Sequence, residues 1–183
     1  MGKENVFDTT AARQYCMERG TLVGVLTSLS FLCSMYGLTM PSLGLLSNAL
    51  GLVAIWMTVR SIRKFRMQTG GVSFGRACWL AIMTYLFAIL LTAAVQFVYF
   101  QFFDQGRLTT QVQTLLEMPE YRAWISQMTQ GEDADEMVNT MLGMFASPAR
   151  ATMQMMWMNC IVALLLMLPT ALLGMAGNAR KTE

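Results

Sequence analysis

The chain has 183 residues, of which 55% are hydrophobic and 13% are charged, about half the charged share of an ordinary globular domain. This composition excludes a soluble enzyme tethered by a small anchor and indicates one compact membrane domain. No histidine is present, and the four cysteines form no C-x-x-C pair, so we expect no zinc site. None of the four lies within residues 104–148, the segment assigned below to the outer side, so we expect no structural disulfide there.

Four hydrophobic stretches free of acidic, basic and histidine residues explain the composition. They cover residues 21–40, 43–59, 77–103 and 152–177. A helix of about 20 apolar residues crosses the hydrocarbon core of a bilayer, and it satisfies all of its own backbone polar groups. We therefore expect an all-α polytopic membrane protein whose domain, residues 21–177, has four transmembrane helices.

The N-terminal arm, residues 1–20, is hydrophilic and predicts a cytoplasmic helix over Thr10–Arg19 that meets the first span near Gly20. In that span Gly20, Gly24 and Ser28 recur at every fourth position, a stripe of small residues that lets another helix approach closely. A short turn at Pro41 then predicts an antiparallel hairpin of the first two spans.

A basic segment without acids follows the second span and contains Arg60, Arg63, Lys64 and Arg66. Basic residues near span ends are retained in the cytoplasm, and the arm and the tail, residues 178–183, are basic as well. We expect both termini in the cytoplasm and residues 104–148 on the outer side. The same four side chains are candidate contacts for anionic lipid head groups.

The exterior segment 104–148, called the insert below, predicts a helical cap. Hydrophobic residues keep helical spacing in three runs, Pro119 can open the middle one, and Ser147-Pro148 is a start signal for the last span. The middle run carries an apolar group suited to covering the bundle, the lipid or a partner: Tyr121, Trp124, Ile125 and Met128.

Among the large polar side chains within the spans we single out Asn48, Gln96 and Asn159, which all fall in the outer half of the bilayer. They predict either a hydrophilic pocket open to the exterior or ordinary hydrogen bonds between helices, and we favour the second interpretation. The many methionines indicate apolar filling rather than a copper site. Without intramembrane carboxylates or histidines, we expect no enzymatic activity and no cofactor, although Glu117 and Glu120 remain outside.

The segment Gly70–Gly75, GGVSFG, opens the third span after the basic stretch. Together with the four-span layout and the long outward segment, it resembles the DUF4199 family of small membrane proteins, found mostly in Bacteroidetes. The resemblance implies a Gram-negative inner membrane and transfers no function and no catalytic residue. Physically, we interpret the motif as a turn with Ser73 as helix cap and Gly75 allowing close packing.

Three functional hypotheses follow. The first is a non-enzymatic inner-membrane protein that acts through membrane-protein partners or self-association, with lipid contacts and no nucleic acid. The second is a transporter or lipid-handling protein that uses a pocket at Asn48, Gln96 and Asn159. The third, implied by the family resemblance, is an accessory subunit of a lipid-linked glycosylation enzyme.

Overall fold

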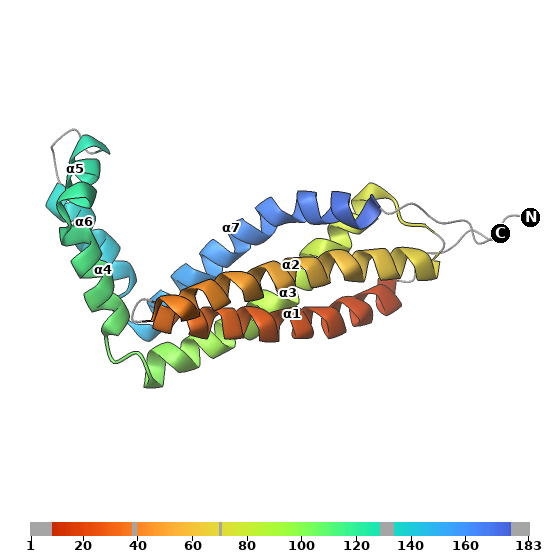
Figure 1. Cartoon of the computed structure of the whole chain (residues 1–183), viewed down its shortest axis with the longest axis horizontal. Helices are drawn as coiled ribbons and strands as arrows, with labels where there is room; N and C mark the ends of the chain where they lie inside the picture. Colours follow the sequence, from red (N-terminus) through yellow and green to blue (C-terminus); the bar gives the residue numbers. More distant parts are fainter. Residues whose placement is uncertain (1–8, 38–39, 70, 129–133, 177–183) are drawn as a thin grey trace, which may run out of the picture. The chain divides into compact units, whose positions relative to one another are not determined.

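The computed structural model describes residues 9–37, 40–69, 71–128 and 134–176, and every regular element among them is an α-helix. Four helices are long: α1 (Thr9–Gly37), α2 (Pro41–Thr69), α3 (Phe74–Phe102) and α7 (Pro148–Met175) (Figure 1). Three are short: α4 (Arg107–Glu117), α5 (Pro119–Met128) and α6 (Ala134–Met144). The all-α fold class expected from the sequence is confirmed.

Each long helix has 28 or 29 residues and so extends over about 43 Å, more than the roughly 30 Å hydrocarbon core of a bilayer. Each contains a stretch apolar enough to cross a membrane. The long helices therefore extend beyond the apolar segments that would cross the membrane. Helix α2 continues ten residues beyond Val59, because Arg, Lys and Met are good helix formers even where hydropathy ends.

The structure decides two expectations about glycines. Helix α1 includes the segment Thr10–Arg19 and runs without interruption through Gly20, so the N-terminal helix continues into the first span. At Gly75, a Cβ atom would meet no atom of the described residues within 4 Å, so the expected close packing there is wrong. Ser73 does precede α3, and its carbonyl accepts the first helical hydrogen bond, from the Ala77 N–H.

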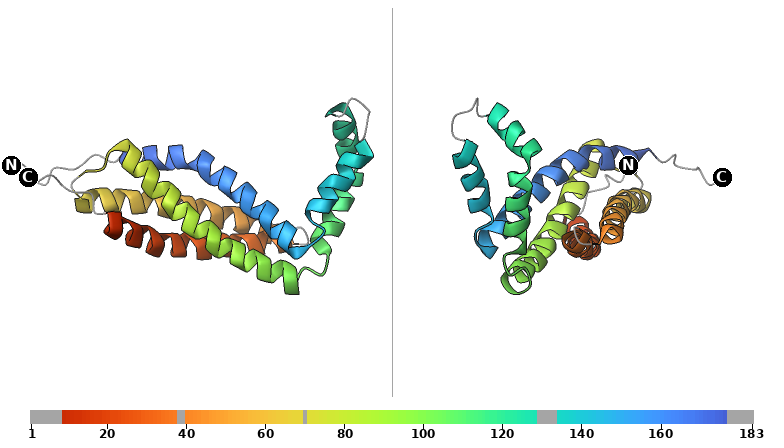
Figure 2. Two further views of the ribbon diagram at one scale, coloured as in Figure 1. Left: turned by 180° about the vertical axis from the view of Figure 1, so that it is seen from behind. Right: turned by 60° about the vertical axis from the view of Figure 1, so that its left-hand side comes forward.

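The chain divides into two compact units. One, here the four-helix unit, comprises Met1–Thr92 and Met158–Glu183, and the other, here the outer unit, comprises Ala93–Trp157. In the four-helix unit, α1 and α2 lie side by side and antiparallel (Figures 1 and 2). All four long helices contribute to its core, which includes Ala12, Cys16, Ile62, Phe65, Leu80, Ala81, Tyr85, Ala163 and Ala171.

Several threonine hydroxyl groups of the four-helix unit find hydrogen-bond partners inside the bundle. Thr58, Thr84 and Thr170 are buried, and each donates to the carbonyl four residues earlier in its own helix, at 2.7 to 3.0 Å. Between helices, the Thr27 and Thr92 hydroxyls form a hydrogen bond of 2.7 Å. These bonds keep polar side chains compatible with an apolar surrounding, in which an unsatisfied group is costly.

The outer unit contains the three short helices, seen together in Figure 2. Gln105 and Gly106 adopt left-handed conformations and turn the chain after α3. The buried Asp104 carboxylate then accepts the Leu108 N–H at 3.1 Å, which places a negative charge at the start of α4. Three helices in the insert are as predicted, and Gly131 with the acids at 132 and 133 lies outside the described residues.

The last long helix begins where the sequence predicts. Pro148 is the first residue of α7, and the Ser147 hydroxyl accepts the Arg150 N–H at 3.3 Å. Proline has no N–H to leave unpaired at this position, and the serine oxygen satisfies one of the free donors of the first turn.

Candidate functional site

Two arginines of the basic segment bind the end of another helix. The Arg63 guanidinium donates from Nε and Nη2 to the Leu173 carbonyl, at 3.0 and 2.9 Å, and Arg66 donates from Nη1 to the Met175 carbonyl. The last four carbonyls of an α-helix have no partner within the helix, and the helix dipole favours a cation there. Arg63 and Arg66 therefore cap the C-terminus of α7.

Close packing of α2 against α7 makes this cap possible. A Cβ atom on Gly174 would lie 2.7 Å from Cγ2 of Ile62, so only glycine permits this approach. Ile62 directly precedes Arg63, which brings both guanidinium groups within reach of the α7 carbonyls. The sequence analysis did not predict this contact. Two signals were present in the sequence: Gly174 in the last turn of the fourth span, and Arg63 and Arg66 three positions apart just after the second span.

The other two basic side chains lie differently. The Arg60 guanidinium is 5.2 Å from the centroid of the Trp56 ring, a cation–π geometry, and Arg60, Trp56 and Lys64 are all exposed. The four residues predicted as a joint lipid contact thus fall into two pairs. One pair is engaged with α7, and the other presents its charge outward.

The stripe of small residues on α1 packs inside the chain. A Cβ atom on Gly20 would lie 2.6 Å from Cβ of Phe87, and one on Gly24 would lie 3.1 Å from Cα of Ala88. Ser28 is buried and donates to the Gly24 carbonyl at 2.7 Å. Because the two glycines face α3 of the same chain, this stripe is not a surface for a second protein.

The three intramembrane amides have different surroundings. Gln96 is only 3% exposed, and its Oε1 has no hydrogen-bond partner among the described residues. Asn159 is half-buried, whereas Asn48 is exposed. The neighbouring Ser47 is buried, and its carbonyl accepts the Ser30 hydroxyl at 2.8 Å, so that side of α2 packs against α1. Asn48 therefore does not line an enclosed pocket.

The apolar group of the insert divides between the inside and the outside of the outer unit. Ile125 is 1% exposed and belongs to the interior, whereas Trp124 is 53% exposed. Tyr121 and Met128 are exposed as well. Residues at i, i+3 and i+7 lie along one side of a helix, so three large apolar side chains share one outward side of α5.

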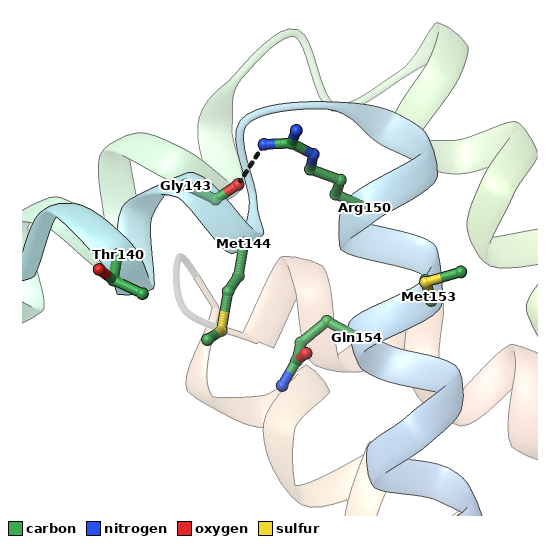
Figure 3. A pocket seen from close by; sticks show the side chains of 6 residues that line it. All are labelled: Thr140, Gly143, Met144, Arg150, Met153 and Gln154. Carbon is green, nitrogen blue, oxygen red and sulfur yellow. Dashed lines mark hydrogen bonds between the residues drawn. The ribbon is translucent and has the colours of Figure 1, made fainter. Parts of the chain in front are cut away.

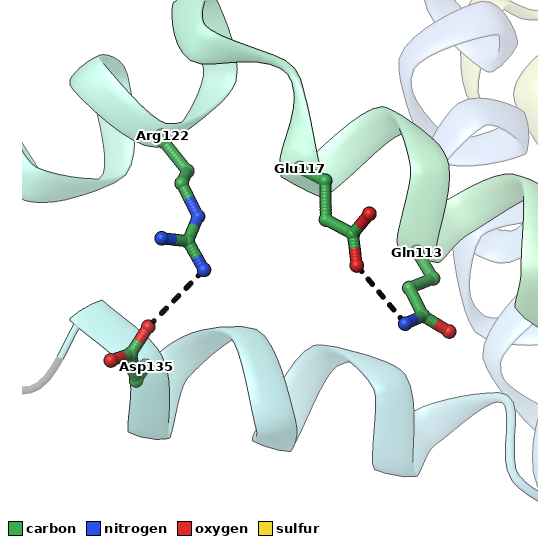
Figure 4. A network of polar contacts seen from close by, with 4 residues as sticks. All are labelled: Gln113, Glu117, Arg122 and Asp135. Atoms are coloured by element: carbon green, nitrogen blue, oxygen red, sulfur yellow. Dashed lines mark hydrogen bonds and ion pairs between the residues drawn. The ribbon is translucent and has the colours of Figure 1, made fainter.

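Two exposed polar contacts lie on the helices of the insert, one between α5 and α6 and one within α4 (Figure 4). Arg122 of α5 and Asp135 of α6 form an ion pair of 3.5 Å, and Gln113 donates to Glu117 within α4 at 3.0 Å. The charged partners of the ion pair are both strongly exposed, so the pair contributes little to stability.

The outer unit also contains an open cavity of about 350 Å³ between α6 and the first turns of α7 (Figure 3). Its lining combines one cation, polar groups and thioethers: Thr140, Gly143, Met144, Arg150, Met153 and Gln154. The Arg150 guanidinium donates to the Gly143 carbonyl at 3.5 Å. A smaller cavity of about 260 Å³ contains Asp104 and Ser147. Asn48, Gln96 and Asn159 line neither cavity.

Four helices that are long and apolar enough to cross a membrane define a multi-pass membrane protein. In the described ranges no group of three or more His, Cys, Asp or Glu side chains is arranged to hold a metal ion. The chain belongs to a family of proteins of unknown function, DUF4199, whose model matches residues 18–175. No curated protein and no solved structure matches the chain.

Proposed function

We propose that this protein is a non-enzymatic module of the bacterial inner membrane that acts by binding another membrane protein through the outer side of α5. In this proposal both termini are cytoplasmic and residues 104–148 are periplasmic. The observation that carries it is the exposure of Tyr121, Trp124 and Met128 on one side of a helix outside the spans.

The physical reason is the cost of leaving such a surface in water. Large apolar side chains gathered on an exposed side are typical of interaction sites, and Trp and Tyr are enriched among the residues that dominate binding energy. Arg122, exposed beside them and paired with Asp135, adds the polar rim usual around such a centre. The partner we expect is a membrane protein with an apolar patch at the outer surface.

The proposal is tested by purifying the protein from its native membrane in mild detergent and identifying what co-purifies by mass spectrometry. We expect a stoichiometric membrane protein with the wild type and with Ser126→Ala, a matched change on the same helix. With Trp124→Ala, affinity for the purified partner should fall by about 30-fold, as for a residue at the centre of an interface. Equal binding by both variants would refute the proposal.

A second candidate is lipid handling, which the cavity at Arg150 favours. A guanidinium beside Gln154 and two methionines suits an amphiphile with an anionic head group, and 350 Å³ falls within the range of small-molecule sites. This cavity lies elsewhere than the pocket expected from the sequence. In the same purification, one retained lipid species that is lost with Arg150→Ala, in place of a protein partner, would favour this function.

A further inference from the structure

Helix α2 carries an outward side whose composition does not suit lipid alone. Leu45 is 73% exposed and Leu52 is 69% exposed, and Asn48 lies between them on the same side. Spacings of three and four residues are those of the contact seam of two packed helices. Asn48 is three residues from the middle of the apolar stretch 43–59, or about 5 Å along the helix.

An outward amide at this depth is unfavourable in lipid. Acyl chains offer neither donors nor acceptors, so a carboxamide facing them loses the hydrogen bonds that water would provide. The backbone beside it is accessible: a Cβ atom on Gly51 would meet no atom within 4 Å in the part of the chain that the structure describes. Another helix can therefore approach α2 closely at the level of Asn48.

We propose that Leu45, Asn48 and Leu52 form the contact surface for α2 of a second copy of this chain. Insertion gives every copy the same orientation in the membrane, so a two-fold axis along the membrane normal sets the two α2 helices parallel. Asn48 then lies opposite Asn48 of the second copy. A carboxamide carries both donor and acceptor, so the two side chains complement each other electrostatically in two reciprocal hydrogen bonds.

The second copy suits this surface better than other occupants. A different protein would need its own polar group at the same depth, whereas a second copy supplies one by symmetry. One asparagine in an otherwise apolar seam also fixes the register of two helices. This dimer goes beyond the proposed function, because it uses α2, whereas the proposed partner binds α5.

The first test measures energy transfer between separately labelled copies of the full chain in lipid vesicles. We expect the wild type to dimerise and Asn48→Leu to weaken the dimer about tenfold, the usual size of an interhelical hydrogen-bond effect in model membrane helices. Asn48→Gln, which keeps donor and acceptor, should retain it, and Leu46→Ala, exposed but about 160° around α2 from Asn48, should have no effect. A monomeric wild type or a full-strength Asn48→Leu dimer would overturn the proposal.

The second test maps the surface by disulfide cross-linking in a cysteine-free background. Leu45→Cys and Leu52→Cys should each cross-link to the same position in the second copy. Leu46→Cys and Val53→Cys should not, because these exposed positions lie on a different side of α2 from the proposed contact surface. Cross-linking without this periodicity, or to a different protein, contradicts a dimer through α2. Trp124→Ala must leave these cross-links unchanged, so failure at α5 and failure at α2 remain distinguishable.

Discussion

At the residue scale, the most informative side chains are Arg63 and Arg66. A basic segment beyond a span is usually explained as a topology signal, and that explanation needs only charge. Here two of the four cations also make directed bonds to the Leu173 and Met175 carbonyls. Position along α2 therefore matters as well as charge, and this separates the arginines from Lys64.

The double variant Arg63→Ala with Arg66→Ala should lower the free energy of unfolding by about 1 kcal/mol for each arginine, because the exposed end of α7 loses charged hydrogen-bond donors. Denaturation in mixed micelles followed by circular dichroism measures this. Lys64→Ala removes one charge from the same helix, and we expect almost no change. Equal losses for Lys64→Ala and for Arg63→Ala alone would show that charge, not capping, is responsible.

At the element scale, the contact of α1 with α3 depends on the absence of side chains. Gly20→Ala would place a methyl group 2.6 Å from Cβ of Phe87, and such overpacking typically costs 1 to 3 kcal/mol, so we expect a loss of about 2 kcal/mol in unfolding free energy. Gly75→Ala, in open space on α3, should leave stability unchanged or raise it slightly. Thermal unfolding in detergent compares the two. A tolerated Gly20→Ala would contradict the close contact.

The existence of the helices could be predicted from the sequence, but their facing directions could not. Hydropathy marks each span, and Ser147-Pro148 and Pro119 mark two helix starts. A span that is apolar on all sides carries no signal for its rotation about its own axis, so the sequence does not show that Ser47 packs against α1 while Asn48 faces outward. Likewise Trp124 and Ile125 are adjacent and both apolar, and only packing within the insert decides which is buried.

At the scale of the whole molecule, the charge distribution predicts a definite orientation in the membrane. In a cysteine-free background, Ser126→Cys on α5 should react with a membrane-impermeant maleimide in spheroplasts. Gln68→Cys, exposed at the end of α2, should react only after the membrane is opened. Both positions are exposed, so accessibility within the protein is matched. The reverse labelling pattern would invert the proposed topology.

The cap on α7 has a consequence for biosynthesis. Of the four long helices α7 is synthesised last, and the side chains that complete its end belong to α2, which is synthesised long before. When α7 docks, the Arg63 and Arg66 donors are therefore already in place on α2. Because α2 supplies these donors, the Leu173 and Met175 carbonyls need no partner from residues that follow α7 in the chain.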